Sequence, residues 1–180
     1  YRSESSGTRT LLVDPSVHQS QAGKTPGITA YALSPDGKFL LYGIDYGGAE
    51  SVTLYVKSLA KGQRLAEAIG RVDTAYAKPH WLPDSSGFFY CQRRHADGVA
   101  APTEHFRNIR VCYHKVGTDP KQDQPILGIG VESSIPLGPE DIPTTKLIKG
   151  SDHILAVVHY GDARELGLYS LALADIFKPR

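Results

Sequence analysis

The sequence predicts an all-β fold built from short antiparallel sheets, and three observations lead to this prediction. Residues 33–42 (LSPDGKFLLY) return as residues 81–90 (WLPDSSGFFY) without a gap, at an offset of 81 − 33 = 48 positions. Residues 52–57 resemble residues 110–115 at an offset of 110 − 52 = 58. The 18 Gly and 12 Pro make up about 17% of the 180 residues, which is rich in turn formers beside an average of roughly 12%.

The repeated ten-residue segment has the form of a strand, a tight turn and a second strand. Pro35 restricts its own φ angle, Asp36 can bond to nearby backbone, and Gly37 tolerates a positive φ. The runs after the two turns, residues 39–44 and 88–91, are apolar without alternation, which predicts strands covered on both faces. A repeat of this length with several strands per unit is typical of β-propeller blades.

We therefore expect a single domain, residues 1–180, that forms a partial β-propeller of about three to four blades, each a four-stranded antiparallel sheet. Its expected units are at about residues 9–30, 31–70, 75–127 and 144–175, with a Gly/Pro-rich connection at 128–145. Residues 9–13 are predicted to be the outer strand of a preceding unit. Residues 65–69 have helical spacing, but the run is too short to predict a helix. An open arc of blades leaves unpaired edge strands, which favour a homodimer.

Composition and charge argue against several classes of protein. The 20 Lys+Arg and 19 Asp+Glu leave a net charge of +1, unlike a nucleic-acid binder or a polybasic membrane-surface protein. No apolar run is long enough to span a membrane, and no secretion signal is visible. The chain begins at Tyr1 and contains no Met, so we expect it to be a piece of a longer protein. Two cysteines are too few for a disulfide framework, which favours a cytoplasmic location and leaves a periplasmic one open.

The sequence contains no element of a recognisable catalytic or cofactor site. None of its serines has the Gly-x-Ser-x-Gly flanks of a hydrolase nucleophile, so no catalytic residue is predicted. Gly128, Gly130 and Ser133 faintly resemble a dinucleotide-binding fingerprint. The third glycine and the following helix are missing, so we interpret this segment as a loop between blades and predict no cofactor.

The cysteines and three histidines are the candidates for a metal site: Cys91, His95, His105, Cys112 and His114. Their spacings are unlike the recurrent zinc patterns, so no metal is predicted. If Tyr90 faces Tyr113 across a hairpin, Cys91 also faces Cys112, since 90 + 113 = 91 + 112. Two buried thiols acting as apolar fillers are the favoured interpretation, and a disulfide or a metal site stays open.

Three further features can each be interpreted either structurally or functionally. The basic patch Arg93, Arg94 and His95 follows a strand; we interpret it as a solvated strand end, with an anion or peptide carboxylate as the alternative ligand. Trp81 begins a buried strand and is predicted to lie in the core. Tyr76 precedes the innermost strand of its unit, where it either packs or contacts a ligand at the face of the propeller.

In their order along the chain, these segments resemble the N-terminal β-propeller of the prolyl oligopeptidase family of serine peptidases. The matching stretches are residues 11–16 (LLVDPS), 33–48 (LSPDGKFLLYGIDYGG), 81–90 and 111–123 (VCYHKVGTDPKQD). The last is similar to a strand and turn of the form Y-H-x-x-G-T with a following acidic residue. Together the stretches cover about residues 9–126, and the similarity fades after Gly128.

The resemblance implies a seven-bladed propeller, paired with an α/β-hydrolase domain that holds Ser, Asp and His and cleaves short peptides after proline. The propeller would cover the active site and select substrates by size. This chain would supply part of the propeller and be inactive alone, with the hydrolase domain and short peptides as partners. Tyr76 is the nearest candidate for a substrate contact. A stand-alone propeller that binds other proteins, or a related oligopeptidase with another cleavage preference, stays open.

Overall fold

The computed structural model describes residues 9–18, 23–48, 52–94, 104 and 106–178. The strands are β1 (Pro26–Leu33), β2 (Phe39–Tyr46), β3 (Val52–Ser58), β4 (Arg64–Asp73), β5 (His80–Trp81), β6 (Gly87–Gln92), β7 (Arg110–Lys115), β8 (Gln124–Leu127), β9 (Ile142–Leu147), β10 (His153–His159) and β11 (Leu166–Ala172). Three single-turn 3-10 helices accompany them: η1 (Pro15–Val17), η3 (Pro120–Gln122) and η4 (Leu173–Asp175). Within the described ranges no helix has the length and apolar character needed to cross a membrane.

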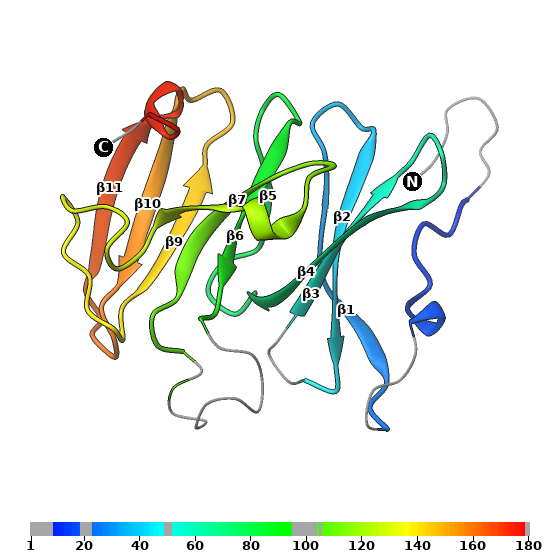
Figure 1. Cartoon of the computed structure of the whole chain (residues 1–180), viewed down its shortest axis with the longest axis horizontal. Coiled ribbons are helices and arrows are strands. Elements are labelled where there is room, and N and C mark those ends of the chain that lie inside the picture. The colour runs from blue at the N-terminus through cyan, green and yellow to red at the C-terminus, as the bar shows by residue number, and fades with distance from the viewer. Residues whose placement is uncertain (1–8, 19–22, 49–51, 95–103, 105, 179–180) are drawn as a thin grey trace.

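The strands form one eight-stranded and one three-stranded antiparallel sheet, and the larger sheet divides into two blades, so that three layers stand side by side (Figure 1). Strands β1–β4 make the first blade and β5–β8 the second, each paired in chain order. The end of β4 crosses to the second blade, where Val72 pairs with Gln92 and Asp73 with Cys91. The third sheet has the order β11-β10-β9 and therefore three strands rather than four. The prediction of an all-β partial propeller is confirmed, as an open arc.

The two copies of the repeated segment fold alike and contact each other. The carboxylate of Asp36 accepts the backbone N–H two residues later at 3.0 Å, and Asp84 accepts that of Ser86 at 3.0 Å. Each turn then uses a positive φ, 71° at Gly37 and 62° at Ser85. The N–H of Asp36 donates to the Oγ of Ser85 at 3.1 Å, so the repeat itself joins the first blade to the second.

Hydrophobic cores fill the spaces between the sheets. The first core joins the two blades through Leu54, Val56 and Ile69 on one side and Trp81 and Phe88 on the other. The second core lies between the second blade and the third sheet. Strands β2 and β6 are buried on both faces, as their continuous apolar runs predict. Trp81 lies in the core as predicted, 7% exposed.

The N-terminal segment differs from its prediction. Residues 10–14 form no strand in the structure, and Arg9 makes only an isolated bridge. Leu12 and Val13 instead cover the free face of the first blade, against Leu40 and Tyr42. The side chain of Lys57 on β3 donates to the carbonyl oxygen of Leu12 at 2.8 Å. This segment follows the blade surface because its apolar side chains need burial even where no neighbouring sheet is present.

Candidate functional site

Tyr76 lies in the loop between β4 and β5, at the lower end of the sheets in Figure 1. Its side chain is 47% exposed, and its ring meets that of His159 edge-on with centroids 5.3 Å apart. From the same loop, Lys78 donates to the carbonyl oxygen of Thr29 on β1 at 3.3 Å. The loop therefore contacts both the first blade and the third sheet. About half of Tyr76 is therefore exposed at this end of the sheets.

A buried ion pair holds the base of the Tyr76 loop. The side chains of Asp73 and Arg93 are 1% and 2% exposed, with the Arg93 Nε 3.5 Å from the Asp73 Oδ2. The second oxygen of Asp73 accepts the N–H of Ala75 at 2.9 Å. The Arg93 guanidinium also lies over the ring of Phe106, 4.7 Å from its centroid. These contacts orient the chain just before Tyr76.

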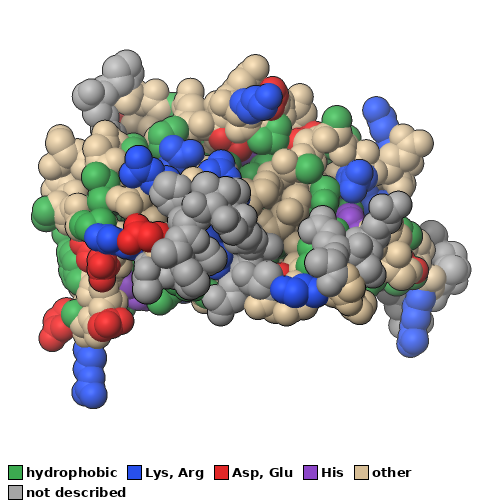
Figure 2. Space-filling view, turned by 60° about the horizontal axis from the view of Figure 1, so that its bottom comes forward, with side chains coloured by type: hydrophobic (Ala, Val, Ile, Leu, Met, Phe, Trp, Pro, Cys, Tyr) green, Lys and Arg blue, Asp and Glu red, His purple; other side chains and the backbone are tan. Residues whose placement is uncertain are grey.

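The basic patch predicted at the end of β6 is divided in the structure. Arg93 is buried and paired, so its interpretation as a solvated strand end is wrong, because Asp73 already supplies its anion. Arg94 is exposed, and its carbonyl oxygen accepts from the Arg71 side chain at 2.6 Å. His95 lies outside the described residues. Figure 2 shows Lys and Arg side chains at several places on the face that includes this end of the molecule.

The two cysteines are free and buried on opposite sides of one sheet. Tyr90 pairs with Cys112 and Cys91 with Val111, so the predicted register is wrong by one residue. Because neighbouring residues of a strand point to opposite faces, this shift separates the two thiols. Cys91 lies in the core next to the third sheet and Cys112 in the core between the blades. The interpretation as buried apolar fillers is confirmed, and a disulfide between them is excluded.

Burial also makes both thiols unreactive. Loss of hydration is the main cause that raises the pKa of the Cys112 thiol to about 11. The pKa of Cys91 is raised further, again chiefly by burial. Since the thiolate is the nucleophile and the metal ligand, neither side chain is suited to covalent catalysis.

His114 belongs to a polar cluster that joins the first two blades, which we call the inter-blade latch. Its Nδ1 lies 2.7 Å from the Asp123 carboxylate, and its Nε2 lies 3.9 Å from Glu67 on β4. The hydroxyl of Tyr90 donates to the other oxygen of Asp123 at 2.7 Å, and the N–H of Gly117 donates to Glu67 at 3.0 Å. The Y-H-x-x-G-T segment thus bonds the second blade to the outer strand of the first.

The remaining candidates do not assemble into a site. His95 and His105 lie outside the described residues, and in the rest of the chain no three His, Cys, Asp or Glu side chains are placed to hold a metal ion. The chain that follows Gly128 and Gly130 continues through turns to β9 without a helix, so these glycines do not form a dinucleotide fold. The Asp73–Arg93 pair could not be identified from the sequence, because the two residues lie twenty positions apart and belong to no shared motif.

Comparison with known families agrees with this architecture. The family model described as prolyl oligopeptidase, N-terminal beta-propeller domain, matches residues 1–134. Among curated relatives, the dual function macrocyclase-peptidase POPB of Galerina marginata is 34% identical over 122 residues, which cover 63% of this chain and 16% of the relative. The prolyl endopeptidase of Elizabethkingia meningoseptica is 23% identical over 128 residues, which cover 71% of this chain and 17% of the relative. The chain thus spans about a sixth of the curated relatives it matches.

Solved structures show the same fold. One from a study of two prolyl endopeptidases superposes with a TM-score of 0.76 at 24% identity, covering 95% of this chain and 24% of its own. Prolyl oligopeptidase B from Galerina marginata, bound to a 25mer macrocyclization substrate, has a TM-score of 0.70 at 24% identity, covering 88% of this chain and 22% of its own. The chain therefore belongs to the prolyl oligopeptidase family, as part of its N-terminal β-propeller domain.

Proposed function

We propose that this chain is the non-catalytic propeller portion of a prolyl oligopeptidase-like serine peptidase that hydrolyses short peptides after proline. Its role is to limit access to an α/β-hydrolase catalytic domain by size and to shield the reacting site from bulk solvent. The cytoplasmic location stays a prediction. The family membership supports the proposal, together with the absence of a Gly-x-Ser-x-Gly segment from the sequence.

One observation carries the proposal furthest: a half-exposed aromatic ring is held at one end of three packed sheets. The buried Asp73–Arg93 pair fixes the chain that leads to Tyr76, and the ring of His159 packs against the Tyr76 ring. Because the ring is already held in position, binding a peptide against it has a lower entropic cost. We assign Tyr76 as a substrate contact in the assembled peptidase.

The assignment is tested in the full-length parent with the substitution Tyr76→Ala. We expect KM for a proline-containing chromogenic peptide to rise about tenfold, the effect of losing roughly 1.4 kcal/mol of binding, with kcat nearly unchanged. Lys78→Ala, which changes the same loop at a bond to backbone, is the matched control and should leave KM within twofold. An unchanged KM in the Tyr76 variant would remove this residue from the substrate site.

The purified 180-residue chain tests the non-catalytic role. We expect no turnover of the chromogenic peptide above buffer, whereas the parent that contains the hydrolase domain hydrolyses it. Turnover by the chain alone contradicts the proposal. A parent reading frame that ends without a hydrolase domain favours a protein-binding propeller instead.

The similarity to a macrocyclase-peptidase favours a second candidate reaction for the parent. In this case the acyl-enzyme is attacked by the amino terminus of the same peptide rather than by water. Mass spectrometry of the products from a proline-containing 25-residue peptide distinguishes cyclisation from hydrolysis. Cyclisation removes one water relative to the linear fragment, and hydrolysis does not.

A further inference from the structure

Three arginines lie at the end of the sheets that also carries Tyr76. Arg94 directly follows β6 and its neighbouring residue, and Arg110 begins β7 opposite the last residue of β6. Arg71 lies near the end of β4, which pairs with the end of β6. Strand register therefore brings these cations to one place, although they lie far apart in the sequence.

A cleft of about 340 Å³, which we call the arginine cleft, lies beside the loop that follows β8. Its lining residues are Arg94, Asn108, Arg110, Ile129 and Val131. The glycine at Gly128 lets the loop come close, because a Cβ atom there would lie 2.9 Å from the Cβ of Arg110. The lining belongs to the second blade, which has the first blade on one side and the third sheet on the other (Figure 1). The arginine cleft is therefore in the middle of the arc and not at either end of it.

The guanidinium of Arg110 has hydrogen-bond donors that neighbouring residues do not use. Its Nη2 donates to the amide oxygen of Gln92 at 2.9 Å, which is a neutral acceptor. Its Nε is buried and has no hydrogen-bond partner among the described residues. A buried N–H group is costly unless an acceptor reaches it. A carboxylate is the acceptor whose geometry matches the planar guanidinium.

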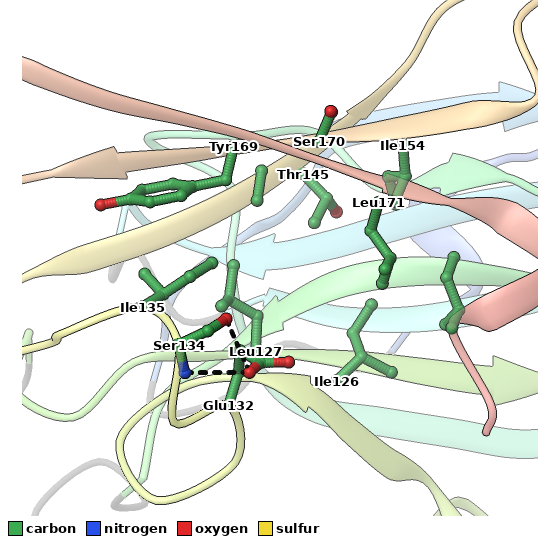
Figure 3. A pocket seen from close by; sticks show the side chains of 12 residues that line it. Ile126, Leu127, Glu132, Ser134, Ile135, Thr145, Ile154, Tyr169, Ser170 and Leu171 are labelled. Carbon is green, nitrogen blue, oxygen red and sulfur yellow. Dashed lines mark hydrogen bonds between the residues drawn. The ribbon is translucent and has the colours of Figure 1, made fainter. Parts of the chain in front are cut away.

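No carboxylate of the described residues balances the positive charge of the arginine cleft. In this part of the chain the ion pairs of arginine belong to Arg93 and Arg107, and not to Arg94 or Arg110. The nearby Glu132 is bonded elsewhere: Figure 3 shows its carboxylate accepting from the N–H and the hydroxyl of its own loop at 3.0 and 2.8 Å, in the cavity between β8 and β11. A cleft lined by charges of one sign attracts a ligand of the opposite sign.

Two residues in the left-handed conformation hold the backbone around the arginine cleft. The φ angle is 62° at Arg71 and 58° at Asn108, values that are uncommon outside glycine and that concentrate at functional sites. The carbonyl oxygen of Arg71 accepts the N–H of Arg93 at 2.8 Å, and its guanidinium donates to the carbonyl oxygen of Arg94 at 2.6 Å. The N–H of Asn108 donates to the carbonyl oxygen of Pro139 at 2.7 Å. Both sides of the cleft are thus fixed in advance, which lowers the entropic cost of binding.

The arginine cleft lies close to Tyr76. Asp73 pairs with Arg93, the neighbour of Arg94, and Tyr76 follows Asp73 by three residues. Three extended residues span at most about 11 Å. One bound peptide can therefore contact Tyr76 with one residue and the arginine cleft with another.

We propose that Arg94, Arg110 and Asn108 bind a carboxylate of the peptide substrate. The parent peptidase then prefers peptides in which an acidic side chain or a free C-terminus lies within about six residues of the residue that contacts Tyr76. The two arginines supply the charge, and the Asn108 amide supplies a further donor. This inference rests on the proposed peptidase function and adds a selectivity for charge to the aromatic contact.

Internally quenched peptides with a single proline test this preference in the full-length parent. In each peptide of a series one glutamate stands two to six residues from the proline, on either side, and a matched peptide carries glutamine instead. A last pair differs only in a free or an amidated C-terminus. We expect kcat/KM to be at least tenfold higher for the charged member of one pair, through a lower KM, because hydrogen bonds between charged groups are stronger than neutral ones. The pair that shows the effect distinguishes an acidic side chain from a C-terminal carboxylate.

Three matched variants of the parent locate the contact. Arg110→Gln and Arg94→Gln should each lower the ratio of kcat/KM between the charged and the neutral peptide at least threefold. Arg94 is exposed, so its variant decides the question even if the Arg110 variant does not fold. Arg164→Gln removes the same charge from the exposed loop between β10 and β11, outside the arginine cleft, and should leave the ratio unchanged. Equal kcat/KM within every pair, or an unchanged ratio in the Arg94 variant, overturns the proposal.

Failure of the proposed function gives a different result. A parent that cleaves none of the peptides contradicts the peptidase role, and fluorescence anisotropy of the same peptides then tests the arginine cleft by itself. At least tenfold tighter binding of the charged peptide, lost in the Arg94→Gln parent, supports the carboxylate site. Equal binding of the charged and neutral peptides overturns it.

Discussion

The Asp73 carboxylate and the Arg93 guanidinium are the most deeply buried opposite charges near the candidate site. Each would be costly alone, because taking a charge out of water has a large penalty that only a well-placed partner offsets. The pair therefore orients the chain ahead of Tyr76 more than it stabilises the fold. If either side chain is removed, the other charge stays buried without its partner.

The first prediction concerns this pair. Arg93→Met leaves Asp73 buried without its counter-charge and should lower the free energy of unfolding by about 3–5 kcal/mol. Urea unfolding of the 180-residue chain measures the loss. Adding Asp73→Asn to the Arg93→Met protein should restore part of it, and a double variant no better than the single one would show that the charges do not act on each other.

The second prediction is a dependence of stability on pH that arises from His80. Burial lowers the pKa of this imidazole to about 4 from the ordinary value of 6.5. Between these values the unfolded chain binds a proton that the folded chain does not, so stability is present above pH 6.5 and is lost as the pH falls toward 4. The slope from this group is at most about 1.4 kcal/mol per pH unit.

His80→Gln removes the titrating imidazole and serves as the control variant. Urea unfolding should show that the free energy of unfolding falls less between pH 7 and pH 5 in the variant than in the original chain. Other groups that titrate in this range contribute to both proteins, so the difference isolates His80. If the free energy of unfolding falls equally in the two proteins, the titration of His80 is not the cause.

At the scale of elements, the blades are joined by specific polar contacts as well as by apolar packing. The indole N–H of Trp81 donates to the carbonyl oxygen of Ala32 in the first blade at 3.1 Å. In the inter-blade latch, the N–H of Gly117, just after β7, donates to Glu67 on β4 at 3.0 Å. Because both contacts cross the same interface, they fix the angle between the two sheets and thereby the position of the Tyr76 loop.

The third prediction tests the close approach of β6 and β7. A Cβ atom on Gly87 would lie 2.2 Å from the carbonyl oxygen of His114, so Gly87→Ala must push two paired strands apart. We expect a loss of at least about 3 kcal/mol in the free energy of unfolding, at the upper end of overpacking effects. Gly70→Ala is the matched control, since nothing lies within 4 Å of its Cβ, and a similar loss in both variants would contradict the explanation.

At the scale of the whole molecule, the largest exposed apolar side chain on the described part lies on β1, the first strand of the first blade. On this strand Ile28 is 40% exposed, Tyr31 79% and Leu33 48%. Apolar side chains gathered on an edge strand favour association with a second copy. We propose that the homodimer expected from the sequence forms through β1.

The fourth prediction follows from this proposal. The mass measured by light scattering should rise above 19.6 kDa with increasing protein concentration. Tyr31→Lys places a charge at the centre of the patch and should weaken the association at least tenfold, whereas Leu168→Lys on β11 should not. A mass that stays at the monomer value at every concentration would contradict the dimer.

Much of the fold could be predicted from local patterns. The 48-residue offset, the turn residues Asp36 and Gly37, and the unbroken apolar runs identify strands and their order, because turn chemistry and strand burial depend on neighbouring residues. The same patterns could not set the register of β6 against β7. A shift of one residue moves Cys91 and Cys112 to opposite faces, and both registers satisfy the apolar pattern of a strand that is buried on both sides.

The class of fold, its repeat, the family and the lack of a Gly-x-Ser-x-Gly segment can all be read from the amino-acid sequence. Only the tertiary structure decided which distant side chains meet: Asp73 with Arg93, Glu67 with His114, and Tyr76 with His159. It also decided that the residues after β11 turn toward the second blade, where Ile176 is buried in the shared core. The physical reason is that these contacts depend on strand register and on the angle between sheets, which are set when the cores pack together.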